Sequence, residues 1–182
     1  MSRGFVLPSQ ISPPIAAAAG ALTLIAAGSG ALSGSSVAFT NCFSATYDAY
    51  RLITTGIYGS AAETMTIIFG AAATGYYNAA IRVNDASAVS AQNVQNHTSS
   101  MRTAQISDGA NAGAGCTLDI TNPFLAYATG VAYSNYSRAN GWFQSGAGML
   151  FTTTSYTGYT LAITGGATFT AGTAKLYGYA LS

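Results

Sequence analysis

The side chains that could carry out acid–base chemistry are few in this chain and do not form a recognisable motif. Five carboxylates and one histidine, His97, are scattered over 182 residues. General acid–base catalysis needs two such groups held close together, and no pair is close in the sequence. His97 lies between Asn96 and Thr98 in a polar stretch and is expected at the surface. The sequence therefore predicts a protein that is not an enzyme.

Nucleophile, cofactor and metal motifs are not found either. Gly28-Ser29-Gly30 lacks the Gly-x-Ser-x-Gly spacing of a nucleophile elbow, and Gly113-Ala114-Gly115 lacks the strand-to-helix setting of a phosphate loop. Cys42, Cys116 and His97 do not have the spacing of a zinc site. We expect no cofactor and no metal. We interpret both cysteines as small buried side chains, with a disulfide between them as the alternative.

The chain carries unusually little charge. Charged residues make up 6% of the sequence and the net charge is +1, whereas about 25% is typical of a soluble domain. Because no cluster of Lys or Arg is present, nucleic-acid binding is not expected. A surface of Ser, Thr, Asn, Gly, Ala and Tyr suits contact with other subunits, with secretion as the rival explanation.

Residues 1–20 are predicted to form an extended arm, because Pro8, Pro13 and Pro14 exclude a continuous helix. The apolar run over residues 15–32 has the length of a membrane span but is mostly Ala, Gly and Ser. We interpret residues 21–28 as the first strand rather than as part of a membrane span or signal peptide. The arm either anchors the chain on a neighbouring subunit, which we favour, or folds back on its own domain. Its candidate contact residues are Phe5, Val6, Leu7, Ile11 and Ile15.

Short runs with an alternating pattern, separated by turn residues, predict β-strands over the rest of the chain. Residues 41–48 are expected to close a compact loop, and residues 50–55 to alternate between two faces. No window predicts an amphipathic helix. The expected strands are 22–26, 35–40, 50–56, 64–70, 76–83, 116–121, 129–137, 141–145, 149–153, 159–164 and 173–180, with a weak strand at 101–106.

This pattern predicts an all-β fold, an antiparallel β-sandwich of jelly-roll type with an extended N-terminal arm. The arm is residues 1–20, and a single sandwich domain covers residues 21–182.

The stretch from Asn84 to Gly115 is polar and is expected to be largely loop, where contacts to partners tend to lie. Twelve Tyr, eight Phe and one Trp would also suit stacking on glycans, although Tyr is an ordinary residue of sandwich faces. We select His97, Arg102 and Trp142 as candidate partner or glycan contacts. Trp142 is chosen because Gly141 before it predicts a bend that exposes the ring.

An ordered set of short segments resembles a family of small virion structural and tail-fibre-like proteins of tailed bacteriophages. The match extends over about residues 21–182. The resemblance implies a β-sandwich, usually in a homotrimer on the virion exterior, without catalytic residues. The segments are Leu22-Thr23-Leu24-Ile25, residues 37–53 around Phe43-Ser44-Ala45-Thr46-Tyr47-Asp48-Ala49-Tyr50-Arg51, Thr74-Gly75-Tyr76-Tyr77, Asn122-Pro123-Phe124, Tyr156-Thr157-Gly158-Tyr159-Thr160-Leu161 and Gly172-Thr173-Ala174-Lys175-Leu176-Tyr177-Gly178-Tyr179.

On this resemblance we expect a capsid decoration, or cement, protein on the outer surface of the virion. The chain is short and has no long shaft or separate attachment domain, which fits a protein placed directly on a capsid or tail surface. Its expected partners are other copies of itself and the major capsid protein or tail proteins, with no membrane contact. The alternative is a tail or fibre protein that binds a host surface glycan.

Overall fold

The computed structural model describes residues 21–84, 88–108, 113–137 and 141–179. Within these ranges every regular element is a β-strand, which confirms the all-β fold class. The extended arm lies outside the described residues, and so do its candidate contacts Phe5, Val6, Leu7, Ile11 and Ile15.

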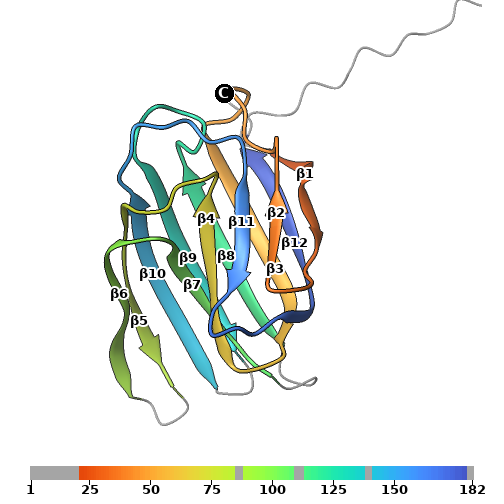
Figure 1. Cartoon of the computed structure of the whole chain (residues 1–182), viewed down its shortest axis with the longest axis vertical. Helices are drawn as coiled ribbons and strands as arrows, with labels where there is room; N and C mark the ends of the chain where they lie inside the picture. The colour runs from red at the N-terminus through yellow and green to blue at the C-terminus, as the bar shows by residue number, and fades with distance from the viewer. Residues whose placement is uncertain (1–20, 85–87, 109–112, 138–140, 180–182) are drawn as a thin grey trace, which may run out of the picture.

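The strands form two antiparallel sheets that pack face to face (Figure 1). The larger sheet extends beyond the smaller one on the side of β5 and β6 (Figure 1). In spatial order the larger sheet contains β1 (Leu22–Ala31), β12 (Phe169–Tyr179), β3 (Ala49–Gly59), β8 (Ala114–Thr121), β9 (Thr129–Ser137), β10 (Trp142–Leu150), β5 (Tyr76–Val83) and β6 (Val89–Thr98). The smaller sheet contains β2 (Ser36–Phe39), β11 (Tyr159–Ile163), β4 (Glu63–Phe69) and β7 (Met101–Ile106).

The alternating pattern of the sequence sets which side chains enter the core. On β3, Tyr50, Leu52 and Thr54 are at most 1% exposed, whereas Arg51 and Ile53 between them are partly exposed. On β4 the odd-numbered apolar residues 65, 67 and 69 are fully buried. The buried face of each of these two strands is the one that the sequence predicted, because a period of two places alternate side chains on opposite sides of a strand.

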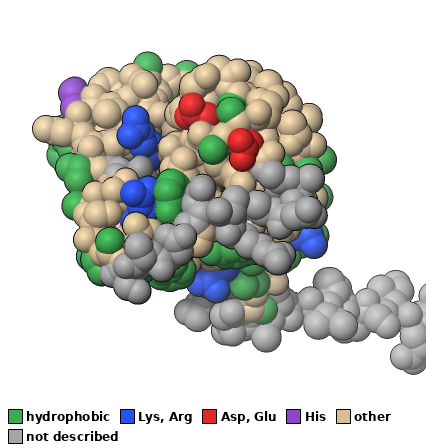
Figure 2. Space-filling model, turned by 90° about the horizontal axis from the view of Figure 1, so that it is seen from below, with side chains coloured by type: hydrophobic (Ala, Val, Ile, Leu, Met, Phe, Trp, Pro, Cys, Tyr) green, Lys and Arg blue, Asp and Glu red, His purple; other side chains and the backbone are tan. Residues whose placement is uncertain are grey.

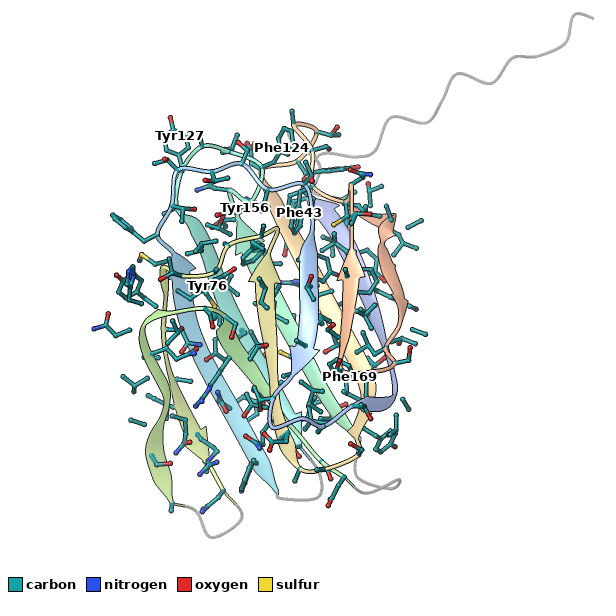
Figure 3. The ribbon with its side chains drawn as sticks, in the orientation of Figure 1. Phe43, Tyr76, Phe124, Tyr127, Tyr156 and Phe169 are labelled. Carbon is teal, nitrogen blue, oxygen red and sulfur yellow. The ribbon has the colours of Figure 1, made fainter. Side chains whose placement is uncertain are left out.

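The loop that leads into β3 fills one end of the core with aromatic rings. The centroid of the Phe43 ring lies 4.8 Å from that of Tyr50, 5.8 Å from that of Tyr159 and 6.1 Å from that of Phe69, and Figure 3 shows it between the two sheets. The Tyr50 hydroxyl accepts a hydrogen bond from the Ser44 N–H and donates one to the Ser44 carbonyl, at 2.9 and 3.0 Å. The compact loop predicted from residues 41–48 is therefore closed by the first core residue of β3.

Two expectations about the strands were wrong. Residues 141–145 and 149–153 were expected as separate strands, but β10 runs without a break from Trp142 to Leu150. Gly146 of β10 lies where neighbouring strands approach closely: a Cβ at this position would lie 2.6 Å from the Tyr133 hydroxyl. The polar stretch was expected to be mostly loop, but it contains the ten-residue strand β6. The sequence signal is weak there because β6 has few apolar side chains.

Side-chain amides of the larger sheet bond the backbone of β7, the edge strand of the smaller sheet. Asn78 Nδ2 donates to the Arg102 carbonyl at 2.6 Å, and Asn135 Nδ2 donates to the Thr103 carbonyl at 2.8 Å. The Arg102 N–H donates to Gln95 Oε1 at 2.8 Å. An edge strand otherwise presents unpaired backbone groups, which are costly when buried. These three amides therefore join β7 to β5, β6 and β9 of the larger sheet.

We expect Asn135→Ala to lower the free energy of unfolding by about 1–3 kcal/mol, because the buried Thr103 carbonyl loses its amide donor. The Cys116 thiol, 3.7 Å from the same oxygen, is the weak donor that is left. Urea unfolding measures the change. Asn96→Ala on the exposed side of β6 is the matched control and should change stability by less than about 0.5 kcal/mol. Equal losses in the two variants would contradict this role of Asn135.

Candidate interaction surface

The outer face of β9, β10, β5 and β6, which is turned away from the smaller sheet, is apolar. The sheet register places Tyr136, Phe143, Val83 and Val89 side by side in one row across these four strands. Ile81 lies in the next row, beside Ser145 and Ala91. We call this surface the outer patch. Its large side chains, with their exposed fractions, are Ile81 60%, Val83 37%, Val89 68%, Val94 74%, Tyr136 55%, Phe143 55% and Met149 46%.

The outer patch is also uncharged. Arg82 is the one charged residue among the described residues of these four strands. It lies on the side of β5 that faces inward, opposite to the outer patch. Its guanidinium lies 4.1 Å from the centroid of the Trp142 ring. In the space-filling view of one end of the molecule the few charged side chains are scattered among uncharged ones (Figure 2). The patch can therefore leave water without desolvating a charge.

Small residues make the middle of the outer patch concave. A shallow hollow of about 340 Å³ is lined by Ala79, Ile81, Ala91, Val94 and Ser145, together with Ala80 and Gly146. Ala and Gly at the centre with larger side chains around them give a surface that another apolar group can enter. The outer patch could not be found from the sequence, because an alternating pattern divides residues between two faces of a strand but does not show which face of the outlying strands is covered.

A second hollow, of about 250 Å³, lies at the end of the sandwich where β10 finishes. It is lined by Ala128, Phe151, Thr152 and Thr153. Phe151 is 70% exposed, and Tyr127, next to Ala128 in the chain, is 67% exposed and points outward at the upper end of the molecule (Figure 3). Exposed aromatic rings beside hydroxyl groups are suited to contact with a sugar. This group, too, was not selected from the sequence.

The three contact residues selected from the sequence do not form one site. His97 is exposed at the end of β6, where the Tyr77 hydroxyl lies 3.3 Å from its Nδ1. Trp142 lies beside the opposite end of β5, about 20 Å away along the strand. The Arg102 side chain is exposed on β7. Gly141 has a φ of 55°, as the predicted bend requires, but Trp142 is only partly exposed and Arg82 covers one face of its ring.

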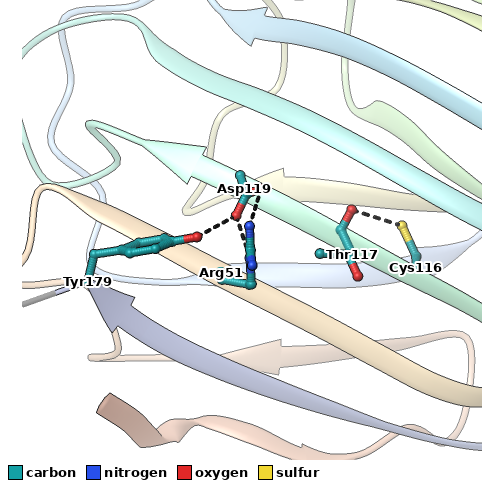
Figure 4. Close-up of polar contacts among 5 residues, drawn as sticks. All are labelled: Arg51, Cys116, Thr117, Asp119 and Tyr179. Atoms are coloured by element: carbon teal, nitrogen blue, oxygen red, sulfur yellow. Dashed lines mark hydrogen bonds and ion pairs between the residues drawn. The ribbon is translucent and has the colours of Figure 1, made fainter. Parts of the chain in front are cut away.

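An ion pair crosses the outer face of the larger sheet on the other side of β9. Arg51 Nε and one terminal nitrogen donate to the two oxygens of Asp119, at 2.7 and 2.8 Å, and the Tyr179 hydroxyl donates to Asp119 Oδ1 at 3.0 Å (Figure 4). The hydrogen bonds from Arg51, and then the one from Tyr179, lower the pKa of Asp119. A carboxylate held ionised in this way can position a strand but is a poor general acid.

The cysteines are free and buried, as the sequence analysis proposed. Burial raises the pKa of the Cys42 thiol to about 11 and raises that of the fully buried Cys116 thiol as well. Since the thiolate is the nucleophile and the metal ligand, both groups are held in the unreactive form. Within the described ranges, no three His, Cys, Asp or Glu side chains are grouped so that they could hold a metal ion.

Comparison of the chain with models of known protein families, with curated proteins and with solved structures finds no match. The resemblance to phage virion proteins therefore stays a prediction from the sequence. The part of the chain that the structure describes has no helix of the length and apolar character needed to cross a membrane.

We expect Asp119→Asn to reduce stability at neutral pH by at most about 1 kcal/mol, because the side chains of the ion pair are 36% and 42% exposed and water screens them. The folded state lowers the pKa of Asp119, so the stabilisation is present above the ordinary carboxyl pKa. It is lost as the pH falls through the lower pKa of the folded state. Urea unfolding of both proteins from pH 7 down to about pH 2 should show a difference that closes in the acid range. A difference that is constant with pH would contradict this account.

Proposed function

We propose that this chain is a non-enzymatic structural protein of a bacteriophage virion, a decoration protein that binds the assembled capsid from outside and stabilises it. The ordered resemblance over residues 21–182 motivates the proposal. The structural observation that carries it is the strand order of the sandwich, considered together with the scarcity of charge on its surface.

We infer that the sandwich is a jelly roll to which two hairpins, β5–β6 and β9–β10, have been added. The other eight strands are divided equally between the sheets, in the orders β1-β12-β3-β8 and β2-β11-β4-β7. With these eight strands numbered by themselves, the orders become 1-8-3-6 and 2-7-4-5, the nested arrangement of a jelly roll. Jelly rolls recur in viral capsid and lectin domains, so the fold supports a virion protein by analogy.

A decoration protein needs broad contact with a repeating surface rather than a catalytic cleft. The charge-poor surface of the chain suits such contact, because few charged groups lose water when it binds. The partners would be the major capsid protein and further copies of this chain, as the homotrimer that the resemblance implies. Because it binds the assembled shell only, each bound copy stabilises the shell by mass action, and many weak contacts add through avidity.

Capsids that lack this protein should take up the purified full-length chain at a fixed ratio to the major capsid protein. Capsids that have bound the chain should then withstand a higher temperature, since binding favours the assembled state. Quantitative mass spectrometry measures the ratio, and calorimetry measures the temperature of shell disruption. A few copies per particle with no thermal gain would contradict the proposal and favour a tail location.

The second candidate is a tail or fibre protein that binds a host glycan, and the hollow beside Phe151 favours it. Phe151→Ala should then lower binding to host cells or to a positive glycan on an array by about tenfold or more. Trp142→Ala, whose ring is partly covered by Arg82, is the matched aromatic control and should bind as the unmodified chain does. A blank array, or equal binding by all three proteins, would count against this function.

A further inference from the structure

We propose that the outer patch is the surface through which copies of this chain associate with one another. This inference rests on the self-association named in the proposed function and adds the surface that carries it; it can be tested on the purified protein without a virion. Its basis is the apolar outer face of the part of the larger sheet that overhangs the smaller one.

The overhanging strands carry apolar side chains on their outer face as well as on their inner face. On β5 the inward set combines the buried Tyr76 with Asn78 and Arg82, while Ile81 and Val83 point outward. On β10 Gln144 is buried at 3% exposure, whereas Phe143 next to it is 55% exposed. A sheet with one face in water normally has polar side chains on that face. The apolar outer face indicates that it, like the inner one, is covered in the assembled state.

The exposed area of the outer patch fits an interface between two folded chains. From the exposed fractions of its seven large side chains, the patch presents roughly 700 Å², more than the ~300–600 Å² of the largest patch on a typical monomer. A standard interface buries about 800 Å² on each partner. The area of the patch is therefore close to what one partner contributes to a standard interface, and larger than the largest apolar patch of a typical monomer.

The chemistry of the patch selects a second copy as its occupant. Where copies meet around a symmetry axis, equivalent residues approach one another, and like charges would repel. The described strands of the patch put no charge on this face, so a copy of the chain meets no such repulsion. Phe143, Ile81 and Tyr136 lie in two neighbouring rows near one end of the strands, and large apolar and aromatic anchors carry most of the binding energy of an interface.

Among the described residues no strand pairs with the outer edge of β6, which borders the patch and would be sheltered by the same contact. β6 has ten residues and contains no Pro, Lys, Arg, Asp or Glu. Edge strands are usually protected by such residues, and the register shifts between β5 and β6 are the protection present here. A copy bound at the outer patch would therefore cover a strand edge that carries few protective residues.

The test uses the full chain with Ile81→Glu and Phe143→Glu together, both at positions where a carboxylate reaches water in the single chain. Leu24→Glu is the matched control, because Leu24 is 53% exposed on β1 at the opposite edge of the same sheet. Light scattering after size exclusion and sedimentation velocity give the association state over a range of concentrations. Circular dichroism and thermal unfolding establish that each variant is folded.

The unmodified chain should form a dimer or trimer. The double variant should be a folded monomer, with the Kd of association raised by about 100-fold or more, while Leu24→Glu should associate within about threefold of the unmodified chain. A chain that is monomeric at about 100 µM, or a double variant that associates normally, would overturn the proposal. A separate measurement of capsid binding tells failure of this inference from failure of the proposed function. If the unmodified chain is monomeric and the double variant no longer binds capsids, the patch contacts the shell protein instead of a second copy.

Discussion

The hydrogen bonds that join β7 to the amide side chains of the larger sheet are the constraint on which the rest of the sandwich depends. β7 contacts β8 and β9 across the core and has a paired strand on one side only. Asn78 and Asn135 supply donors to its carbonyls, and Gln95 supplies the acceptor. Because these amides come from β5, β9 and β6, the hairpins of the overhang are held to the core by polar bonds as well as by strand pairing.

This constraint explains why the overhang is polar inside. A core filled only with apolar side chains would leave the β7 backbone groups without partners, at a cost of about 1–3 kcal/mol for each buried group. Amides satisfy those groups and also fill the space beside them. The alternate residues of β5 and β10 point to the other face and form the outer patch. The β7 edge thus accounts for the amides on the inner face of the overhang.

Most strands and their faces could be predicted from the sequence, because the period of two is local. The alternation of residues 50–55 follows from it, and so does the burial of residues 65, 67 and 69 on β4. The strand β6 and the unbroken course of β10 could not be predicted this way. β6 has few apolar side chains and is held by pairing with β5. β10 contains Gly146 and Gly148 and pairs with β5, which is distant in sequence, as well as with β9. The outer patch depends on which strands the smaller sheet leaves uncovered, and no local pattern contains that information.

The separation of the outer patch from the aromatic cluster has a consequence for which substitutions the sandwich can accept. The outer patch lies wholly on β5, β6, β9 and β10, whereas the aromatic cluster around Phe43 is built from β3, β4, β11 and the loop before β3. Substitutions on the outer side of the hairpins can therefore accumulate without disturbing the main core.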